Sequence, residues 1–181
     1  MEPSGDRLID HFRLMARNNH WANQRLLDAC VKLGRAGFDA PRVGFFPSLR
    51  ETLTHVYLID QYYRDALEEG GVGLAIFRRP PVFEGPEDLR IAQAVSDRKL
   101  IAFCDELSPA DLDWSVLTDR GAQGMIPERV TALLAHLFQH QIHHRGQAHA
   151  MLASTRVHPP QLDEFFLDYD RDPAAERARA G

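Results

Sequence analysis

Residues 5–34 carry apolar side chains at alternating spacings of four and three, and this pattern lasts for about eight helical turns. The positions are Leu8, Phe12, Met15, Asn19, Ala22, Leu26, Ala29 and Leu33, with one polar residue, Asn19, among them. Such spacing places all of them on one face of a single long helix. A helix of this length with one apolar stripe must bury it against other helices, and this requirement most constrains the fold.

Three further long helices are predicted. Ser48, followed three residues later by Glu51, forms a capping box that starts the second helix, and glycines at 70, 71 and 73 end it. Pro86 stands at a first-turn position of a third helix that extends to about residue 107. Pro127 is expected to start the fourth, which ends near residue 154 before the prolines at 159 and 160. The buried stripe of the second helix is Leu49, Leu53, Val56, Ile59 and Tyr63.

Four amphipathic helices bury their stripes best as an all-α four-helix bundle. The long proline-broken link after the second helix favours a crossover connection. Between the third and fourth helices, Ser108 is expected to cap a short helical turn, and residues 115–127 allow a small hairpin. The bundle is predicted to occupy residues 1–160 as one domain, with 161–181 as a C-terminal extension, packed on the bundle or partly disordered.

Composition excludes several classes of partner. The 181 residues carry a net charge of −5 and no basic cluster interleaved with aromatics, so direct binding to nucleic acid is not expected. No apolar run approaches the roughly 20 residues that span a bilayer, and no secretory signal is visible, which makes the cytoplasm the expected location. Cys30 and Cys104 have no neighbouring cysteine and are expected to be reduced and packed.

Five of the nine histidines lie between residues 136 and 150. His140 and His144 continue an apolar seam along this helix, which runs Leu133, Leu137, His140, His144, Ala148 and Met151. An alternative stripe is nearly all polar and suits a solvated flank: Ala132, His136, His140, His143 and Gln147. We favour the apolar seam that contains His140 and His144. Two imidazoles four residues apart on one helix face can bind the same divalent ion.

His55 provides a third imidazole, because it lies on the shoulder of the apolar stripe of the second helix. Three neutral imidazoles buried without partners would each cost roughly 1–3 kcal/mol, and a bound cation removes this cost. Packed or solvated histidines are the alternative. Gly146 is consistent with a close backbone approach or with a tolerated helix glycine. Asn19 either orients a ligand imidazole or sets the register of the bundle.

The sequence supplies no clear general base. Gln141 follows His140 where a metalloprotease helix would carry glutamate, so peptide hydrolysis is disfavoured. Asp60 and Asp10 are candidates that also suit structural or surface roles. Arg145 and Gln147 suit substrate contacts, packing or a dimer contact. The remaining histidines are expected at surface, packing or capping positions: His11, His20, His136, His143, His149 and His158.

Three segments together resemble the DinB/YfiT-like family of four-helix bundles. They are "NNHWANQRLLDA", "LRETLTHVYLIDQYY" and "HLFQHQIHHRGQAHAML", within residues 8–154. The resemblance implies that the metal ligands are His55, His140 and His144, that the ion is divalent, usually zinc or nickel, and that the protein is a homodimer. It also implies kinship with thiol S-transferases that use bacillithiol or mycothiol and with thiol-dependent maleylpyruvate isomerases.

Three hypotheses for function follow. The first is a metal-dependent enzyme that activates a thiol or water for attack on a small electrophilic substrate, because three protein ligands leave a coordination position open. The second is a stress-response bundle in which the ion stabilises the fold without catalysis. The third is a helical interaction protein without a metal.

Overall fold

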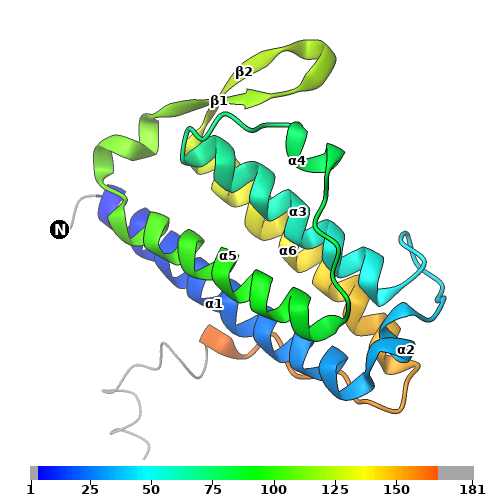
Figure 1. Ribbon diagram of the computed structural model, residues 1–181. Coiled ribbons are helices and arrows are strands. Elements are labelled where there is room, and N and C mark those ends of the chain that lie inside the picture. The colour runs from blue at the N-terminus through cyan, green and yellow to red at the C-terminus, as the bar shows by residue number, and fades with distance from the viewer. Residues whose placement is uncertain (1–3, 167–181) are drawn as a thin grey trace, which may run out of the picture.

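The computed structural model describes residues 4–166 and consists mainly of four long helices packed side by side (Figure 1). The long helices are α1 (Ser4–Leu33), α3 (Leu49–Leu67), α5 (Pro86–Glu106) and α6 (Val130–Ala153). Short helices follow α1 and α3, namely α2 (Arg35–Asp39) and α4 (Ala75–Arg78). The predicted all-α four-helix bundle is therefore confirmed, although neither short helix was predicted.

The bundle has the crossover connection expected from the sequence. α1 packs mainly on α5 and α3 mainly on α6, while α1 with α6 and α3 with α5 complete the ring. Figure 1 shows α3 and α5 running in the same direction, so the link over residues 68–85 returns along the bundle. Arg50, at the start of α3, donates hydrogen bonds to the backbone oxygens of Phe83 and Glu84, which holds the end of this link beside α3.

The helix ends follow local sequence signals. Ser48 accepts a hydrogen bond from the Glu51 amide at 3.1 Å, so the predicted cap is present. The Glu51 carboxylate accepts from the Ser48 hydroxyl at 3.4 Å, where a capping box would have it accept from the Ser48 amide. Gly34 ends α1 with a φ of +82°, a conformation that residues with a Cβ rarely adopt. Pro86 begins α5, as predicted.

The segment before α6 corrects one prediction. Pro127 does not start the last helix, because it belongs to β2 (Met125–Arg129), which pairs antiparallel with β1 (Ser115–Asp119). Pro127 lies opposite Leu117 in this two-stranded ribbon, where both strands are edges and a residue without an N–H is tolerated. The helix begins three residues later, at Val130. The short turn at Pro109–Asp113 and the hairpin are confirmed.

The core follows the predicted seam of α1 except at its first position. Leu8 is 38% exposed, and Ile9 beside it takes the buried position. Cys30 and Cys104 are buried and form no disulfide bond, and burial raises the pKa of each thiol to about 12. Along residues 4–166, no helix is long and apolar enough to cross a membrane.

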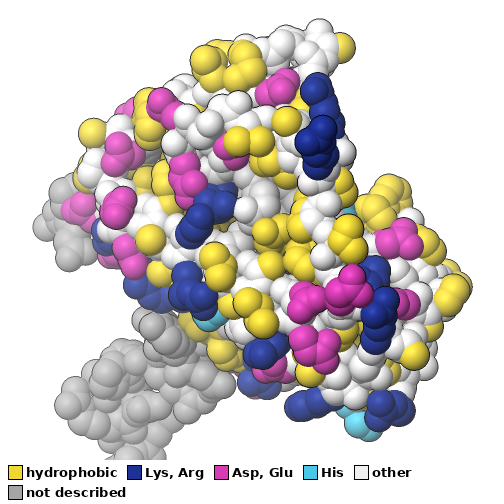
Figure 2. All heavy atoms as spheres, in the orientation of Figure 1, with side chains coloured by type: hydrophobic (Ala, Val, Ile, Leu, Met, Phe, Trp, Pro, Cys, Tyr) yellow, Lys and Arg dark blue, Asp and Glu magenta, His cyan; other side chains and the backbone are white. Residues whose placement is uncertain are grey.

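The predicted C-terminal extension is described only in part. Phe165 is buried, and its ring lies 5.7 Å from that of Trp21 on α1. Residues 167–181 lie outside the described residues, so a domain boundary at 160 stays a prediction. On the face shown in Figure 2, acidic and basic side chains are interspersed over the bundle.

Candidate metal site

The structure brings together His55 from α3 and His140 and His144 from α6. One nitrogen from each ring can be chosen so that all three lie within 4.8 Å of one another. The Nε2 atoms of His55 and His140 are 3.0 Å apart, and the ring centroids of His140 and His144 are 4.4 Å apart. Because α3 and α6 pack directly on each other, residues about 85 positions apart meet at one point.

This geometry fits a divalent ion. Two imidazole nitrogens bound to one tetrahedral ion at about 2.1 Å lie on the order of 3.4 Å apart. The 3.0 Å separation of the His55 and His140 Nε2 atoms is close to that value. Two nitrogen lone pairs at this distance repel unless a proton or a cation lies between them. A single shared proton would satisfy two rings but not His144, whereas an ion suits all three.

Gln147 fixes the orientation of His144. The Nδ1 atom of His144 lies 2.8 Å from the Gln147 Oε1 atom, an acceptor, so Nδ1 carries the proton and Nε2 is left with its lone pair. The Gln147 amide nitrogen also lies 3.1 Å from Nε2 of His143. Gln147 therefore orients the His144 ring, a role that differs from the substrate, packing and dimer roles expected from the sequence.

The three histidines are neutral at physiological pH. Burial lowers the pKa of His55 to about 4, and His144 adds to the effect. Burial lowers the pKa of His140 to about 3, with further contributions from the neighbouring histidines. Burial also lowers the pKa of His144, which the hydrogen bond to Gln147 opposes. A neutral imidazole has the free lone pair that a metal ion requires.

Phe46 covers one side of the histidines and was not identified from the sequence. Its ring centroid lies 4.6 Å from that of His55 and 5.8 Å from that of His144. It comes from the loop between α2 and α3, whose "GFFPS" segment reads from the sequence only as a connection. Two aromatic residues in a proline-containing loop were the available signal.

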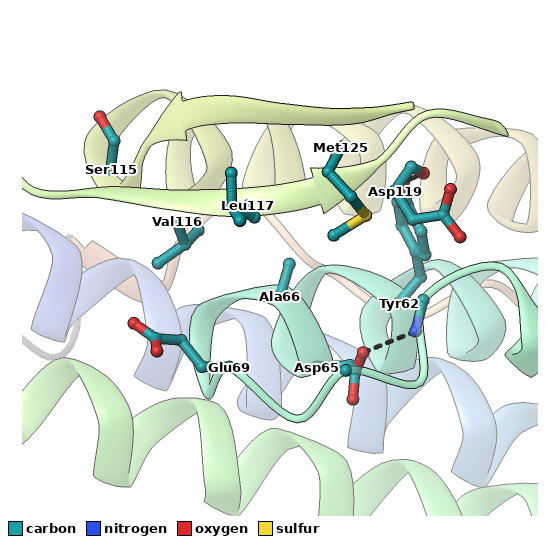
Figure 3. Close-up of a pocket in the computed structure, with 11 residues that line it drawn as sticks. Tyr62, Asp65, Ala66, Glu69, Ser115, Val116, Leu117, Asp119 and Met125 are labelled. Carbon is teal, nitrogen blue, oxygen red and sulfur yellow. Dashed lines mark hydrogen bonds between the residues drawn. The ribbon is translucent and has the colours of Figure 1, made fainter. Parts of the chain in front are cut away.

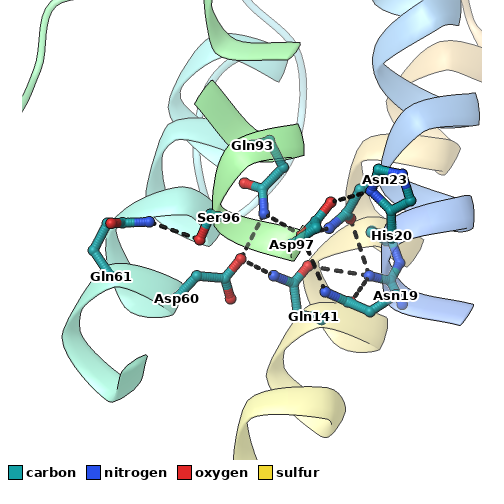
Figure 4. A network of polar contacts seen from close by, with 10 residues as sticks. Asn19, His20, Asn23, Asp60, Gln61, Gln93, Ser96, Asp97 and Gln141 are labelled. Carbon is teal, nitrogen blue, oxygen red and sulfur yellow. Dashed lines mark hydrogen bonds and ion pairs between the residues drawn. The ribbon is translucent and has the colours of Figure 1, made fainter. Parts of the chain in front are cut away.

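A buried polar network lies in the interior of the bundle (Figure 4). Gln141 and Arg145 each follow a histidine of the cluster, and both are buried. Gln141 donates a hydrogen bond to Asp60 of α3. Arg145 donates to Gln141 at 3.1 Å, and also to the side-chain oxygens of Asn19 and Asn23 on α1, the latter at 3.0 Å. The hydrogen-bond partners of Arg145 are therefore buried side chains of the bundle and not a substrate.

Asp97 of α5 completes the network, so that all four long helices contribute. It accepts hydrogen bonds from Asn23 at 3.0 Å and from Gln93 at 2.9 Å, and lies 3.3 Å from the His20 ring. Gln93 also donates to Asp60 at 2.6 Å. Sequence reasoning placed neither Gln93 nor Asp97 in a functional role, since a polar residue on a helix reads as solvated until its partners are known.

Neither of the two carboxylates considered as general bases belongs to the histidine cluster. Asp60 is buried in the network, where burial and the charge of Asp97 raise its pKa to about 7. Its Oδ1 atom has no hydrogen-bond partner within residues 4–166. Asp10 is exposed and pairs with Arg13 at 3.1 Å. Asp60 is therefore structural and Asp10 belongs to the surface.

The other features singled out from the sequence have ordinary explanations. Asn19 bonds Arg145 and Asp97, which supports its register-setting role. Apart from its own helical turns, a Cβ on Gly146 would meet no atom of the described chain within 4 Å, so no close approach requires this glycine there. His149 contacts the backbone oxygen of Pro160 at 3.0 Å. Other histidines lie at exposed positions, namely His11, His136, His143 and His158.

A separate hollow of about 420 Å³ lies between the hairpin and the end of α3 (Figure 3). Val116 and Met125 provide apolar walls, while Asp65 and Asp119 lie at its edge. The Asp65 carboxylate accepts from the amides of residues 72 and 73, and that of Asp119 accepts from the amides of residues 74 and 121. These carboxylates therefore brace the loops.

Comparisons with known proteins agree with this fold. The model of the DinB family matches residues 8–176. Protein DinB of Bacillus subtilis (strain 168) is 24% identical over 139 residues, which cover 74% of this chain and 80% of that protein. The crystal structure of the DinB-like protein YjoA from Bacillus subtilis has a TM-score of 0.59 and 17% identity, and the match covers 86% of this chain and 97% of that one. The chain belongs to the DinB family.

Proposed function

We propose that this protein is a metal-dependent enzyme that activates a thiol or a water molecule for attack on a small electrophilic substrate. The observation that carries the proposal is the cluster of His55, His140 and His144, three neutral imidazoles whose donor atoms lie within 4.8 Å of one another. Three protein ligands are typical of catalytic rather than structural zinc.

The histidines, Gln147 and Phe46 have different roles in this proposal. His55, His140 and His144 would hold a divalent ion, and zinc or nickel suits their imidazole nitrogens. When bound, such an ion lowers the pKa of water or of a thiol and so supplies a nucleophile at neutral pH. Gln147 keeps His144 in the ligating tautomer, and Phe46 shields one side of the rings from water.

A second candidate is a bundle that the ion stabilises without catalysis. The observation that favours it is that the histidines come from two helices, α3 and α6, so that an ion would also tie these helices together. Such a protein would act in a stress response only by binding a partner. The homodimer stays a prediction under both candidates, and the thiol co-substrate stays a prediction under the first.

Metal analysis of protein purified without a histidine tag tests both candidates. We expect near-stoichiometric zinc or nickel, or uptake of one ion on titration, and loss of this ion in His144→Ala. His143→Ala is the matched control, because His143 is the exposed neighbour of His144. A protein that neither contains nor takes up a divalent ion contradicts both proposals.

Turnover then separates the two candidates. The metal-loaded protein is assayed with 1-chloro-2,4-dinitrobenzene and a panel of cysteine, glutathione, bacillithiol and mycothiol, and with p-nitrophenyl acetate for attack by water. Catalysis requires that His144→Ala abolishes turnover while its circular dichroism spectrum stays that of the parent. Loss of helix content in His144→Ala, without turnover in the parent, favours the stabilising ion.

A further inference from the structure

A hollow of about 440 Å³ lies beside His55, between the first turns of α3 and the end of the link before α5. Figure 2 shows hydrophobic side chains at the surface along this link. The volume is within the range of roughly 300–1,000 Å³ that is usual for small-molecule sites. The apolar residues at its wall are Phe46, Leu58, Pro81, Val82 and Phe83.

The charged side chains at this hollow already have partners. The Arg50 guanidinium bonds the Asp39 carboxylate at 2.6 Å and the Glu84 backbone oxygen at 3.3 Å. Glu51 is held in the cap of α3 by Ser48. Neither side chain is therefore poised to recognise a charged ligand, and apart from Thr54 and His55 the rest of the wall is apolar.

Phe46 is common to the hollow and to the histidine cluster. Its ring packs on His55 and reaches His144, and it also lines the hollow together with His55. A molecule in the hollow therefore lies against the ring of a proposed ligand. Burying an apolar group there would also exclude water from the part of His55 that lines the hollow.

We propose that this hollow binds the uncharged apolar part of the electrophilic substrate, an aromatic or branched alkyl group, and so directs its reactive atom to the histidines. This substrate class rests on the proposed function, because only a reaction at the histidines makes the bound molecule a substrate. Three observations support the proposal. The wall of the hollow is mainly apolar, the charge of Arg50 is already paired with Asp39, and Phe46 both lines the hollow and contacts the histidine cluster.

Binding of a neutral aromatic probe tests the hollow without any turnover. The probe is 4-(trifluoromethyl)benzyl alcohol, and its dissociation constant is measured by ¹⁹F NMR on metal-free protein. Val82→Glu puts a charge at the rim and is expected to weaken binding at least fivefold. Val82 is 86% exposed, so the variant folds, which circular dichroism checks. Val95→Glu on α5 is the matched control, since Val95 is 43% exposed and does not line the hollow.

A second measurement places the probe relative to the histidines. With one Co²⁺ per chain, the fluorine signal of the bound probe is expected to broaden, and Val82→Glu is expected to reduce the broadening. Binding without broadening in cobalt-loaded protein contradicts the assignment to the substrate. If cobalt does not bind at all, the proposed function fails, while probe binding to the metal-free protein still decides whether the hollow takes an apolar ligand.

Three further outcomes overturn the proposal. Absence of probe binding to the parent protein does so directly. Binding that Val82→Glu leaves unchanged but Leu117→Glu abolishes would place the probe at the hairpin, where Leu117 lines the other hollow. If Val82→Glu converts a dimer to a monomer by size-exclusion chromatography and the parent dimer does not bind the probe, a second copy of the chain covers this surface.

Discussion

The Nε2 atoms of His55 and His140 lie 3.0 Å apart across the contact between α3 and α6. The same two helices are joined in the interior by the hydrogen bond from Gln141 to Asp60. Because Gln141 directly follows His140, this buried bond fixes how α6 is rotated relative to α3. The clustered histidines meet because the buried residues beside them allow only one rotation of the helix.

Removal of the Gln147 amide should weaken metal binding while leaving the fold intact. In Gln147→Leu, the His144 ring loses the acceptor that holds its proton on Nδ1. Loss of such an orienting partner typically lowers metal affinity by roughly 10–100-fold. Competition with a chromophoric zinc chelator measures the affinity, and Gln139→Leu, an exposed glutamine on the same helix, is the control. Equal affinities in both variants would show that His144 needs no orienting partner.

In the metal-free protein, the contribution of His140 to stability should be lost as the pH falls below neutrality. The pKa of His140 is about 3 in the folded protein, against about 6.5 for an ordinary histidine, so the unfolded chain binds this proton first. The stabilising effect is complete above about pH 6.5 and is lost as the pH falls toward about 3. The unfolding midpoint at pH 7.5 and 5.0, measured in EDTA, should therefore fall more in the parent than in His140→Gln.

The exposed His158 provides the control for that experiment. His158→Gln should show the same fall in the midpoint as the parent protein. If His140→Gln also falls as much as the parent, His140 does not resist protonation in the folded state.

The sequence predicted the helices because helical periodicity is a local property. The cap at Ser48 and the first-turn Pro86 marked two helix starts where the structure has them. Pro127 misled the prediction because proline is tolerated both in a first helical turn and in an edge strand. The choice between them depends on pairing with Leu117, which the local pattern does not reveal.

The three clustered histidines were predictable, whereas their surroundings were not. His140 and His144 stand on a seam that spacing reveals, and the family resemblance pointed to the same positions and to His55. Packing was one of the roles expected for Arg145, but the sequence indicated neither its partners nor the burial of Gln141 beside it. Their burial depends on partners from other helices, a long-range property that periodicity does not encode.

Replacement of Arg145 should destabilise the whole bundle. Its guanidinium is buried among side-chain oxygens of Asn19, Asn23 and Gln141. Burial lowers its pKa only to about 10, so it stays charged at neutral pH. Arg145→Met leaves the interior carboxylates without this cation and should lower the free energy of unfolding by about 3–5 kcal/mol. Urea denaturation measures the change.

Arg129→Met is the control for this measurement, because Arg129 is exposed at the start of α6. Its effect should stay within about 0.5 kcal/mol, as is usual for surface positions. A loss in Arg145→Met no larger than that of the control would contradict a structural role for the buried guanidinium.

Replacement of Asp60 by asparagine should become more favourable as the pH rises. Burial, with the charge of Asp97, raises the pKa of Asp60 to about 7, above the value of about 3.9 for an ordinary aspartate. Between these two pH values the folded protein holds a proton on Asp60 that the unfolded chain has lost. The contribution of Asp60 to stability is therefore full below about pH 3.9 and is lost as the pH rises through about 7. The amide introduced by Asp60→Asn does not titrate, while its oxygen can still accept from Gln93 and Gln141. The unfolding midpoint of Asp60→Asn relative to the parent should therefore rise between pH 5 and pH 8, and a difference that is constant over this range would mean that Asp60 is already ionised at pH 5.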